Sequence, residues 1–181
     1  LFAEGAFSQA FVPILAEYKN NRSENETRAL IDHVTTLLGV TLFIVTLIGI
    51  IAAPLIIYIS APGFSADSEK FTLTVTLLRI TFPYILFISL VALAGGILNT
   101  YSKFSVPAYT PVLLNLSFIG CSIWLVPYID PPVLALAWAV FLGGVLQLLF
   151  QIPYLIRIKR MPRFRFKSSD TGSGRVLKLM L

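Results

Sequence analysis

Residues 30–60 read LIDHVTTLLGVTLFIVTLIGIIAAPLIIYIS, an almost uninterrupted apolar run. A helix needs about 20 consecutive, mostly apolar residues to cross the hydrocarbon core of a bilayer, so this run is longer than required. It closes on Ala61-Pro-Gly-Phe64, in which Pro followed by Gly suits a type II turn. The stretch therefore predicts a membrane-spanning helix.

Similar runs fill most of the chain. Complete spans are expected at about 72–99, 106–128 and 133–156, and a partial one at about 1–16. These runs are continuous, whereas a transmembrane β-barrel has alternating segments of roughly ten residues. Several long spans in succession also exclude a secretory signal peptide. The sequence thus predicts an all-α, polytopic helical membrane protein.

The composition agrees with this fold class. Of the 181 residues 56% are hydrophobic and 13% charged, and the mean hydropathy is +0.82; in soluble domains about 25% are charged. A single cysteine, Cys121, excludes a disulfide within the chain and a Cys-rich metal site. We expect a transmembrane bundle at 1–156, a basic cytoplasmic loop at 157–174 and the start of a further helix at 175–181. We interpret the chain as a fragment of a longer protein.

The basic residues predict the orientation of the spans, because cytoplasmic loops are enriched in Lys and Arg. Lys70 falls on one side of the membrane, Arg79 lies inside a span, and the other Lys and Arg residues fall on the opposite side. The cytoplasmic segments are therefore 17–29, 100–105 and 157–178. The turns that face outward are 61–71 and 129–132.

The net charge of +5 follows from this one-sided distribution, so nucleic acid is not expected as a partner. The run from Arg157 to Lys167 either anchors the topology or attracts anionic membrane lipids, at about 1 kcal/mol for each basic residue near the surface.

Polar residues within a bilayer are costly and are functional candidates. On a helix Glu4 and Ser8 stack four residues apart, with Gly5 and Gln9 beside them, which makes one polar sector. This sector predicts contact with a polar cavity. Because the span is partial, a position of Glu4 in the headgroup region is the alternative.

Arg79 and Asn99 are the candidates in the expected span at 72–99. Arg79 precedes Pro83, which invites a kink, and it either snorkels outward or binds an anion with its planar fork. Asn99 ends a stripe of small residues that begins at Ser89, and such a stripe favours close helix packing. In the last complete span Gly143, Gln147 and Gln151 recur every four residues, and Gln147 either lines a hydrophilic cavity or makes a hydrogen bond between helices.

No catalytic, metal-binding or phosphate-loop motif is present in the sequence, so neither an enzyme nor a cofactor is expected. The remaining classes are a transporter, a channel or a membrane scaffold. Prolines within the spans, such as Pro54 and Pro83, favour a transporter with kinked helices.

Several strings resemble the MurJ (MviN) family of lipid II flippases. The longest is Phe2-Ala-Glu-Gly-Ala-Phe-Ser-Gln-Ala-Phe-Val-Pro-Ile-Leu-Ala-Glu-Tyr-Lys19. The others that agree in order and spacing include Ala61-Pro-Gly-Phe64, Arg79-Ile-Thr-Phe-Pro-Tyr-Ile85, Ile97-Leu-Asn99 and Pro131-Pro-Val-Leu-Ala-Leu-Ala-Trp138. The resemblance covers the whole chain.

The resemblance implies a multi-pass protein of the bacterial inner membrane, in the multidrug/oligosaccharidyl-lipid/polysaccharide exporter superfamily. Such proteins have about fourteen helices in two bundles, of which this chain would supply the second to sixth. The implied activity is translocation of lipid II from the cytoplasmic to the periplasmic leaflet by alternating access. The implied partners are lipid II, membrane lipids and the rest of the transporter.

The resemblance also implies a substrate cavity. The residues of this chain that match it are Glu4, Gly5, Ser8, Gln9, Arg79 and Asn99. The arginines and the aspartate on which the family relies fall outside these 181 residues, so we do not expect the chain alone to flip lipid II. Two alternatives stay open: an exporter of another lipid-linked oligosaccharide or of a drug, and a non-transporting scaffold.

Overall fold

The computed structural model describes residues 2–64 and 68–163, with the side chains of residues 2–10 outside this description. Most of the expected loop at 157–174 and the expected helix start at 175–181 therefore lie outside the described residues. The described elements are α1 (Phe2–Asn21), α2 (Glu24–Ser60), η1 (Pro62–Phe64), α3 (Ser68–Thr81), α4 (Tyr84–Thr100), α5 (Ser105–Trp124), η2 (Val126–Tyr128) and α6 (Val133–Arg157).

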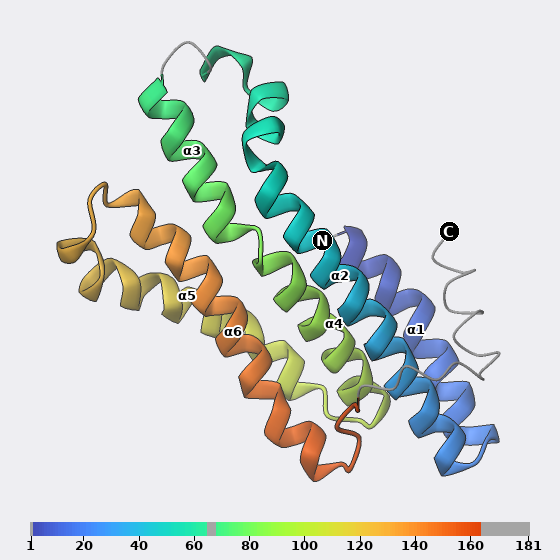
Figure 1. Cartoon of the computed structure of the whole chain (residues 1–181). Helices are drawn as coiled ribbons and strands as arrows, with labels where there is room; N and C mark the ends of the chain where they lie inside the picture. Colours follow the sequence, from blue (N-terminus) through green and yellow to red (C-terminus); the bar gives the residue numbers. More distant parts are fainter. Residues whose placement is uncertain (1, 65–67, 164–181) are drawn as a thin grey trace.

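Helix α4 lies at the centre of the bundle, where it contacts α1, α2, α5 and α6. Helices α2 and α3 form one antiparallel hairpin and α5 and α6 another (Figure 1). The links that follow α1, α4 and α6 lie toward the bottom of Figure 1, and the α2–α3 turn lies at its top. The segments expected on the cytoplasmic side are thus at the same end of the bundle.

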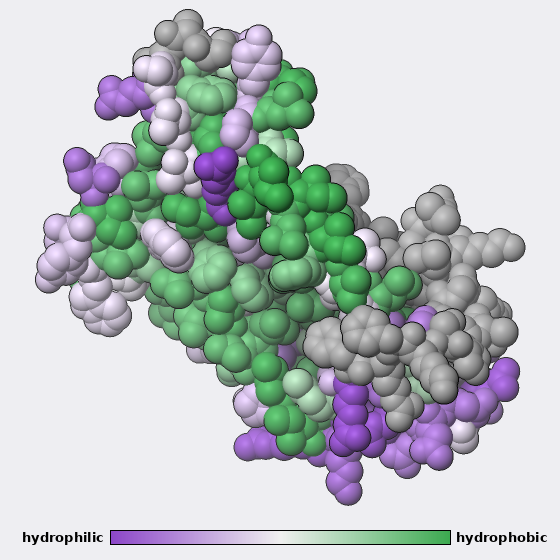
Figure 2. Space-filling model, in the orientation of Figure 1, coloured by the Kyte–Doolittle hydropathy of each residue, from purple (hydrophilic) through white to green (hydrophobic). Residues whose placement is uncertain are grey.

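Four stretches of the described chain are long and apolar enough to cross a membrane. They are Glu24–Ser60, Ser68–Thr100, Ser105–Trp124 and Val133–Arg157. Large apolar side chains on α2 point away from the bundle: Ile51 is 76% exposed and Ile59 is 70% exposed. Figure 2 shows hydrophobic residues across the middle of the visible face and hydrophilic residues mainly toward its ends. This distribution fits a protein surrounded by lipid.

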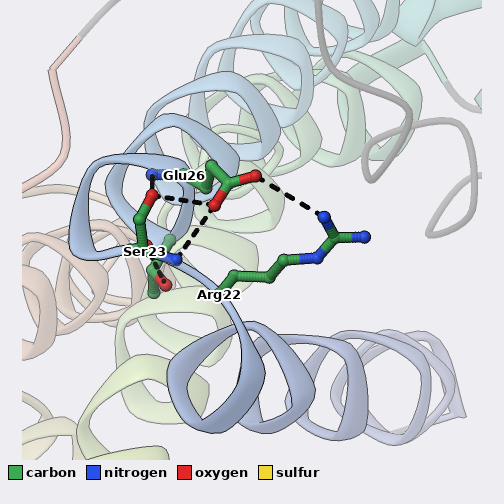
Figure 3. Close-up of polar contacts among 4 residues, drawn as sticks. Arg22, Ser23 and Glu26 are labelled. Atoms are coloured by element: carbon green, nitrogen blue, oxygen red, sulfur yellow. Dashed lines mark hydrogen bonds and ion pairs between the residues drawn. The ribbon is translucent and has the colours of Figure 1, made fainter.

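Helix α2 begins at Glu24 because a capping box forms there (Figure 3). The backbone N–H of Glu26 donates to Ser23 Oγ at 3.3 Å, and the Ser23 N–H donates to Glu26 Oε2 at 2.9 Å. Arg22 pairs with Glu26 at 3.6 Å. Helix α2 is then about 55 Å long, against about 30 Å of hydrocarbon, so its polar first turns extend beyond the membrane core.

The threonines of α3 form hydrogen bonds within the helix itself. The hydroxyls of Thr72, Thr74, Thr76 and Thr81 each donate to the carbonyl oxygen four residues earlier, at 2.8–2.9 Å. Such bonds remove the cost of carrying hydroxyl groups into a bilayer, where water is absent. Helix α3 is thereby compatible with the membrane despite its many threonines.

The chain breaks between α3 and α4 at Phe82 and Pro83. Proline has no N–H to donate to the preceding turn, which explains the interruption. The Phe82 ring fills the space beside Gly49 of α2, where even a Cβ would overlap it. The expected kink at Pro83 is therefore a change from one helix to another, held against α2.

The main core lies in the half of the bundle that contains the link between α1 and α2. Its buried residues come mainly from α1, α2 and α4: Phe11, Ile14, Leu15, Tyr18, Leu30, Ile31, Val34, Leu93, Ala94, Ile97 and Leu98, with Val106 of α5 and Leu155 of α6. A small cluster of Ala53, Ile57 and Val75 joins α2 to α3 toward the other end.

The packing of α6 on α4 predicts the effect of enlarging a glycine. A Cβ at Gly144 would lie 2.8 Å from Tyr84 Cδ2 and 2.9 Å from Phe87 Cβ. We expect Gly144→Ala to destabilise the full-length protein by about 1–3 kcal/mol, because α4 or α6 must shift. The control is Gly120→Ala, whose Cβ would meet Trp124 at an ordinary 3.8 Å. Equal thermal unfolding midpoints in detergent for the two variants would contradict this packing.

Candidate functional site: a polar groove between α4, α5 and α6

A groove of about 440 Å³ runs between α4, α5 and α6, and we call it the polar groove. Its volume is within the range of small-molecule sites, about 300–1,000 Å³. The described residues that line it are Tyr84, Ile88, Val91, Ala92, Gly95, Gly96, Asn99, Pro107, Thr110, Pro111, Leu114, Gln147 and Gln151. None of these carries a charge, and several carry groups that donate or accept hydrogen bonds.

Two amides of α6 lie at the floor of the polar groove. Gln147 is 2% exposed, and its Nε2 donates to the Thr110 carbonyl at 3.0 Å. Gln147 Oε1 and both amide atoms of Gln151, which is 0% exposed, have no hydrogen-bond partner among the described residues. A buried amide without a partner costs free energy, and the cost is greater where water is excluded. Gln147 and Gln151 therefore lie beneath the surface of the groove, with hydrogen-bonding capacity that the described residues do not use.

Small residues bring the helices around the groove close together. A Cβ at Gly95 would lie 3.3 Å from Pro107 of α5, and one at Gly96 would lie 3.3 Å from Val12 of α1. The small-residue stripe of α4 therefore packs against neighbouring helices, as its sequence suggested. It also forms one wall of the groove.

Asn99 lines the groove at the end where cationic side chains gather. Lys19 Nζ donates to the Thr100 carbonyl at 2.8 Å and lies 4.7 Å from the centre of the Tyr101 ring. Arg160 Nε donates to Tyr101 Oη at 2.7 Å, and its guanidinium lies 5.2 Å from the same ring. Two cations thus surround one aromatic ring, that of Tyr101, two residues after Asn99.

Asp32 holds the chain after α6 at this end, a role that the sequence did not indicate. It is 1% exposed, and its Oδ1 accepts the backbone N–H of Arg163 at 2.8 Å. Arg160 also pairs with the exposed Glu24 at 3.1 Å. The sequence did contain a signal for a role of Asp32, since it is a carboxylate within the expected span at 30–60 and charged residues in spans are rare. Its partner is 131 residues away in sequence and was not foreseeable.

Arg79 lies outside the polar groove. It is exposed, and its Nε donates to the Ile50 carbonyl of α2 at 3.3 Å. It precedes Asn99 by twenty residues, which is about 30 Å along a helical path. The structure therefore does not bring Arg79 and Asn99 together. A place for Arg79 in a larger substrate cavity stays a prediction.

Glu4, Gly5, Ser8 and Gln9 belong to α1, but their side-chain environment lies outside the described residues. The predicted polar sector of α1 accordingly stays a prediction. Among the residues whose side chains are described, no group of three or more His, Cys, Asp or Glu is placed to hold a metal ion.

Comparison with known proteins shows what the chain is related to. A family model described as "Lipid II flippase MurJ" matches residues 1–181. The chain belongs to this family. MurJ proteins are inner-membrane proteins of the multidrug/oligosaccharidyl-lipid/polysaccharide exporter superfamily, which confirms the predicted resemblance, fold class and localisation.

Individual relatives of the MurJ family agree. "Lipid II flippase MurJ" of Burkholderia cenocepacia is 51% identical over 162 residues, which are 90% of this chain and 31% of the relative. The "Probable lipid II flippase MurJ" of Vibrio cholerae is 45% identical over all of this chain and 36% of its own length. The "Probable lipid II flippase MurJ" of Haemophilus influenzae is 42% identical over all of this chain and 37% of its own length. The chain thus spans about a third of these relatives.

The contact between Asp32 and Arg163 predicts a change in protease sensitivity. Asp32→Ala removes the acceptor of the Arg163 N–H, so residues 158–163 detach more often from α2. We expect tryptic cleavage after Arg160 in the full-length protein to become about tenfold faster. Asp32→Asn is the control, since it keeps the Oδ1 acceptor. If both variants are cleaved at the wild-type rate, Asp32 does not hold this segment.

Proposed function

We propose that the full-length protein translocates lipid II from the cytoplasmic to the periplasmic leaflet by alternating access. The single observation that carries this proposal is the match of all 181 residues to the lipid II flippase family model. In this proposal the chain forms most of the first of two helical bundles. The activity is transport without covalent change to the substrate, so it needs no catalytic residue and no cofactor.

The physical problem of translocation supports this proposal. A headgroup with a pyrophosphate and sugars does not cross hydrocarbon unaided, because charged and polar groups lose their hydration. The polar groove offers hydrogen-bonding groups within a bundle whose outer surface is apolar. The lipid tail stays in the membrane, beside exposed apolar side chains such as those of α2.

We further propose that Glu4, Gly5, Ser8 and Gln9 of α1 face the same headgroup as Asn99. Glu4 precedes Phe11 by seven residues, so the two positions share a face of the helix. Phe11 is fully buried and packs against α4 at Gly96. This register supports a position of Glu4 on the side of α1 that faces α4.

The activity is testable in cells depleted of the full-length protein. We expect lipid II on the outer face of the membrane to fall on depletion and to recover when the wild-type gene is returned. Full-length protein with Glu4→Ala should fail to restore it at a normal expression level. Exposure of lipid II that is unchanged after depletion would contradict the proposed function.

Substrate preference separates lipid II from other lipid-linked sugars. We expect the purified full-length protein to bind lipid II more tightly than an undecaprenyl-linked O-antigen unit. The reverse order would favour an exporter of another oligosaccharide. Normal growth of cells that carry only the Glu4→Ala protein would instead favour a scaffold.

A further inference from the structure

A second groove, of about 450 Å³, lies between α5 and α6, and we call it the apolar groove. It follows α5 from Leu113 to Leu125, the residue that caps the end of this helix. Its lining is almost entirely apolar and includes no charged side chain. The hydroxyl of Ser117 is buried there and already donates to the Ala139 carbonyl at 2.7 Å. The apolar groove therefore suits an uncharged, apolar occupant.

The apolar groove is continuous with the surface that faces lipid. Leu116, Leu142 and Leu146 line it, and each of these side chains is at least 40% exposed. Helices α5 and α6 are both long and apolar enough to cross a membrane, and the family is one of inner-membrane proteins. Apolar side chains on the outside of such a bundle contact lipid chains. A lipid chain therefore reaches the groove directly from the bilayer.

Aromatic side chains mark one end of the apolar groove. Trp124 is 76% exposed, and its ring lies beside Gly120, where a Cβ would be 3.8 Å from it. Tyr128, in the link after α5, is 85% exposed. Trp and Tyr are enriched where a membrane meets water, because an apolar ring there carries a polar group. Since the turn at 129–132 is expected to face outward, this end of the groove lies at the outer interface.

The length of the apolar groove matches one leaflet of the bilayer. Leu113 and Leu125 are twelve residues apart in sequence, which is about 18 Å along a helix. The hydrocarbon of one leaflet is about 15 Å thick, half of the membrane core. The acyl chain of a phospholipid spans one leaflet, whereas an undecaprenyl tail is far longer than a leaflet is thick. The groove therefore fits an acyl chain better than the tail of lipid II.

We propose that the apolar groove binds the acyl chain of a phospholipid from the outer leaflet, with Trp124 at the level of its headgroup. The inference concerns a lipid of the surrounding membrane, so it does not depend on the proposed transport of lipid II. Three observations carry it: the uncharged lining, the continuity with the lipid-facing surface, and the length of one leaflet. The tail of lipid II and a helix from the rest of the protein are the competing occupants.

The test uses the full-length protein in nanodiscs that contain one of two photoreactive lipids. One is phosphatidylethanolamine with a diazirine in an acyl chain, and the other is lipid II with a diazirine in its tail. Mass spectrometry of peptides locates the label after irradiation. We expect the phosphatidylethanolamine probe to label the groove residues at 113–125 and 142–146, and this labelling to saturate as the fraction of the probe rises. Labelling at the exposed Ile51 of α2 should instead rise in proportion to that fraction.

A variant that fills the apolar groove gives a second measurement. Gly120→Leu introduces a side chain whose Cβ meets only Trp124, at an ordinary 3.8 Å, so the helices need not shift. We expect it to lower labelling of the groove by phosphatidylethanolamine about fivefold, because the acyl chain loses apolar contact area. The matched control is Ile119→Phe, which adds bulk to the next residue of α5, exposed and outside the groove lining. Its labelling should equal that of the wild type.

Each of the other outcomes overturns the inference. Groove labelling in the wild type that rises in proportion to the probe, as at Ile51, indicates bulk lipid without a site. Labelling by the lipid II probe in preference assigns the groove to the substrate tail, and labelling by neither probe indicates that a helix fills it. Equal labelling of Gly120→Leu and the wild type shows that the chain lies elsewhere. The flippase proposal stands in all these cases, because the depletion experiment tests it separately.

Discussion

The rest of the structure depends on one constraint: in hydrocarbon, each polar group must find its partner within the protein. Most described side chains obey it locally, as the threonines of α3 do by donating to their own helix. Ser117 obeys it across a helix pair. Among the described residues, buried polar atoms of Thr35, Thr46, Gln147 and Gln151 have no partner, and the two glutamines lie beside the polar groove.

Two kinds of contact hold the bundle together. Apolar packing on α4 joins the helices in one half of the bundle, and polar contacts add to it at the end of that half. Lys19 and Arg160 meet at Tyr101, and Asp32 binds the chain after α6. In the proposed mechanism, these contacts make the ends of α1, α2, α4 and α6 one unit that moves together. Asn99, which lines the polar groove, lies beside this unit.

The sequence was sufficient for the class of fold and the family, because apolar runs and long strings depend only on local order. It also indicated Asn99, Gln147 and Gln151 as polar groups within spans. It did not show that they share a groove, because the rotation of one helix against another depends on packing. For the same reason the sequence did not show that Arg79 lies apart from Asn99, or that Asp32 contacts the chain after α6. The capping box at Ser23 was readable in principle, but apolar periodicity alone placed the span later, at about residue 30.

The central claim is that the full-length protein carries the headgroup of lipid II across the membrane through its helical bundles. The most direct measurement is an electron cryomicroscopy structure of the full-length protein in lipid nanodiscs with lipid II bound. The account predicts density for the headgroup of lipid II among the transmembrane helices, with the lipid tail in the surrounding membrane. Lipid II density confined to the outer surface of the protein would contradict it.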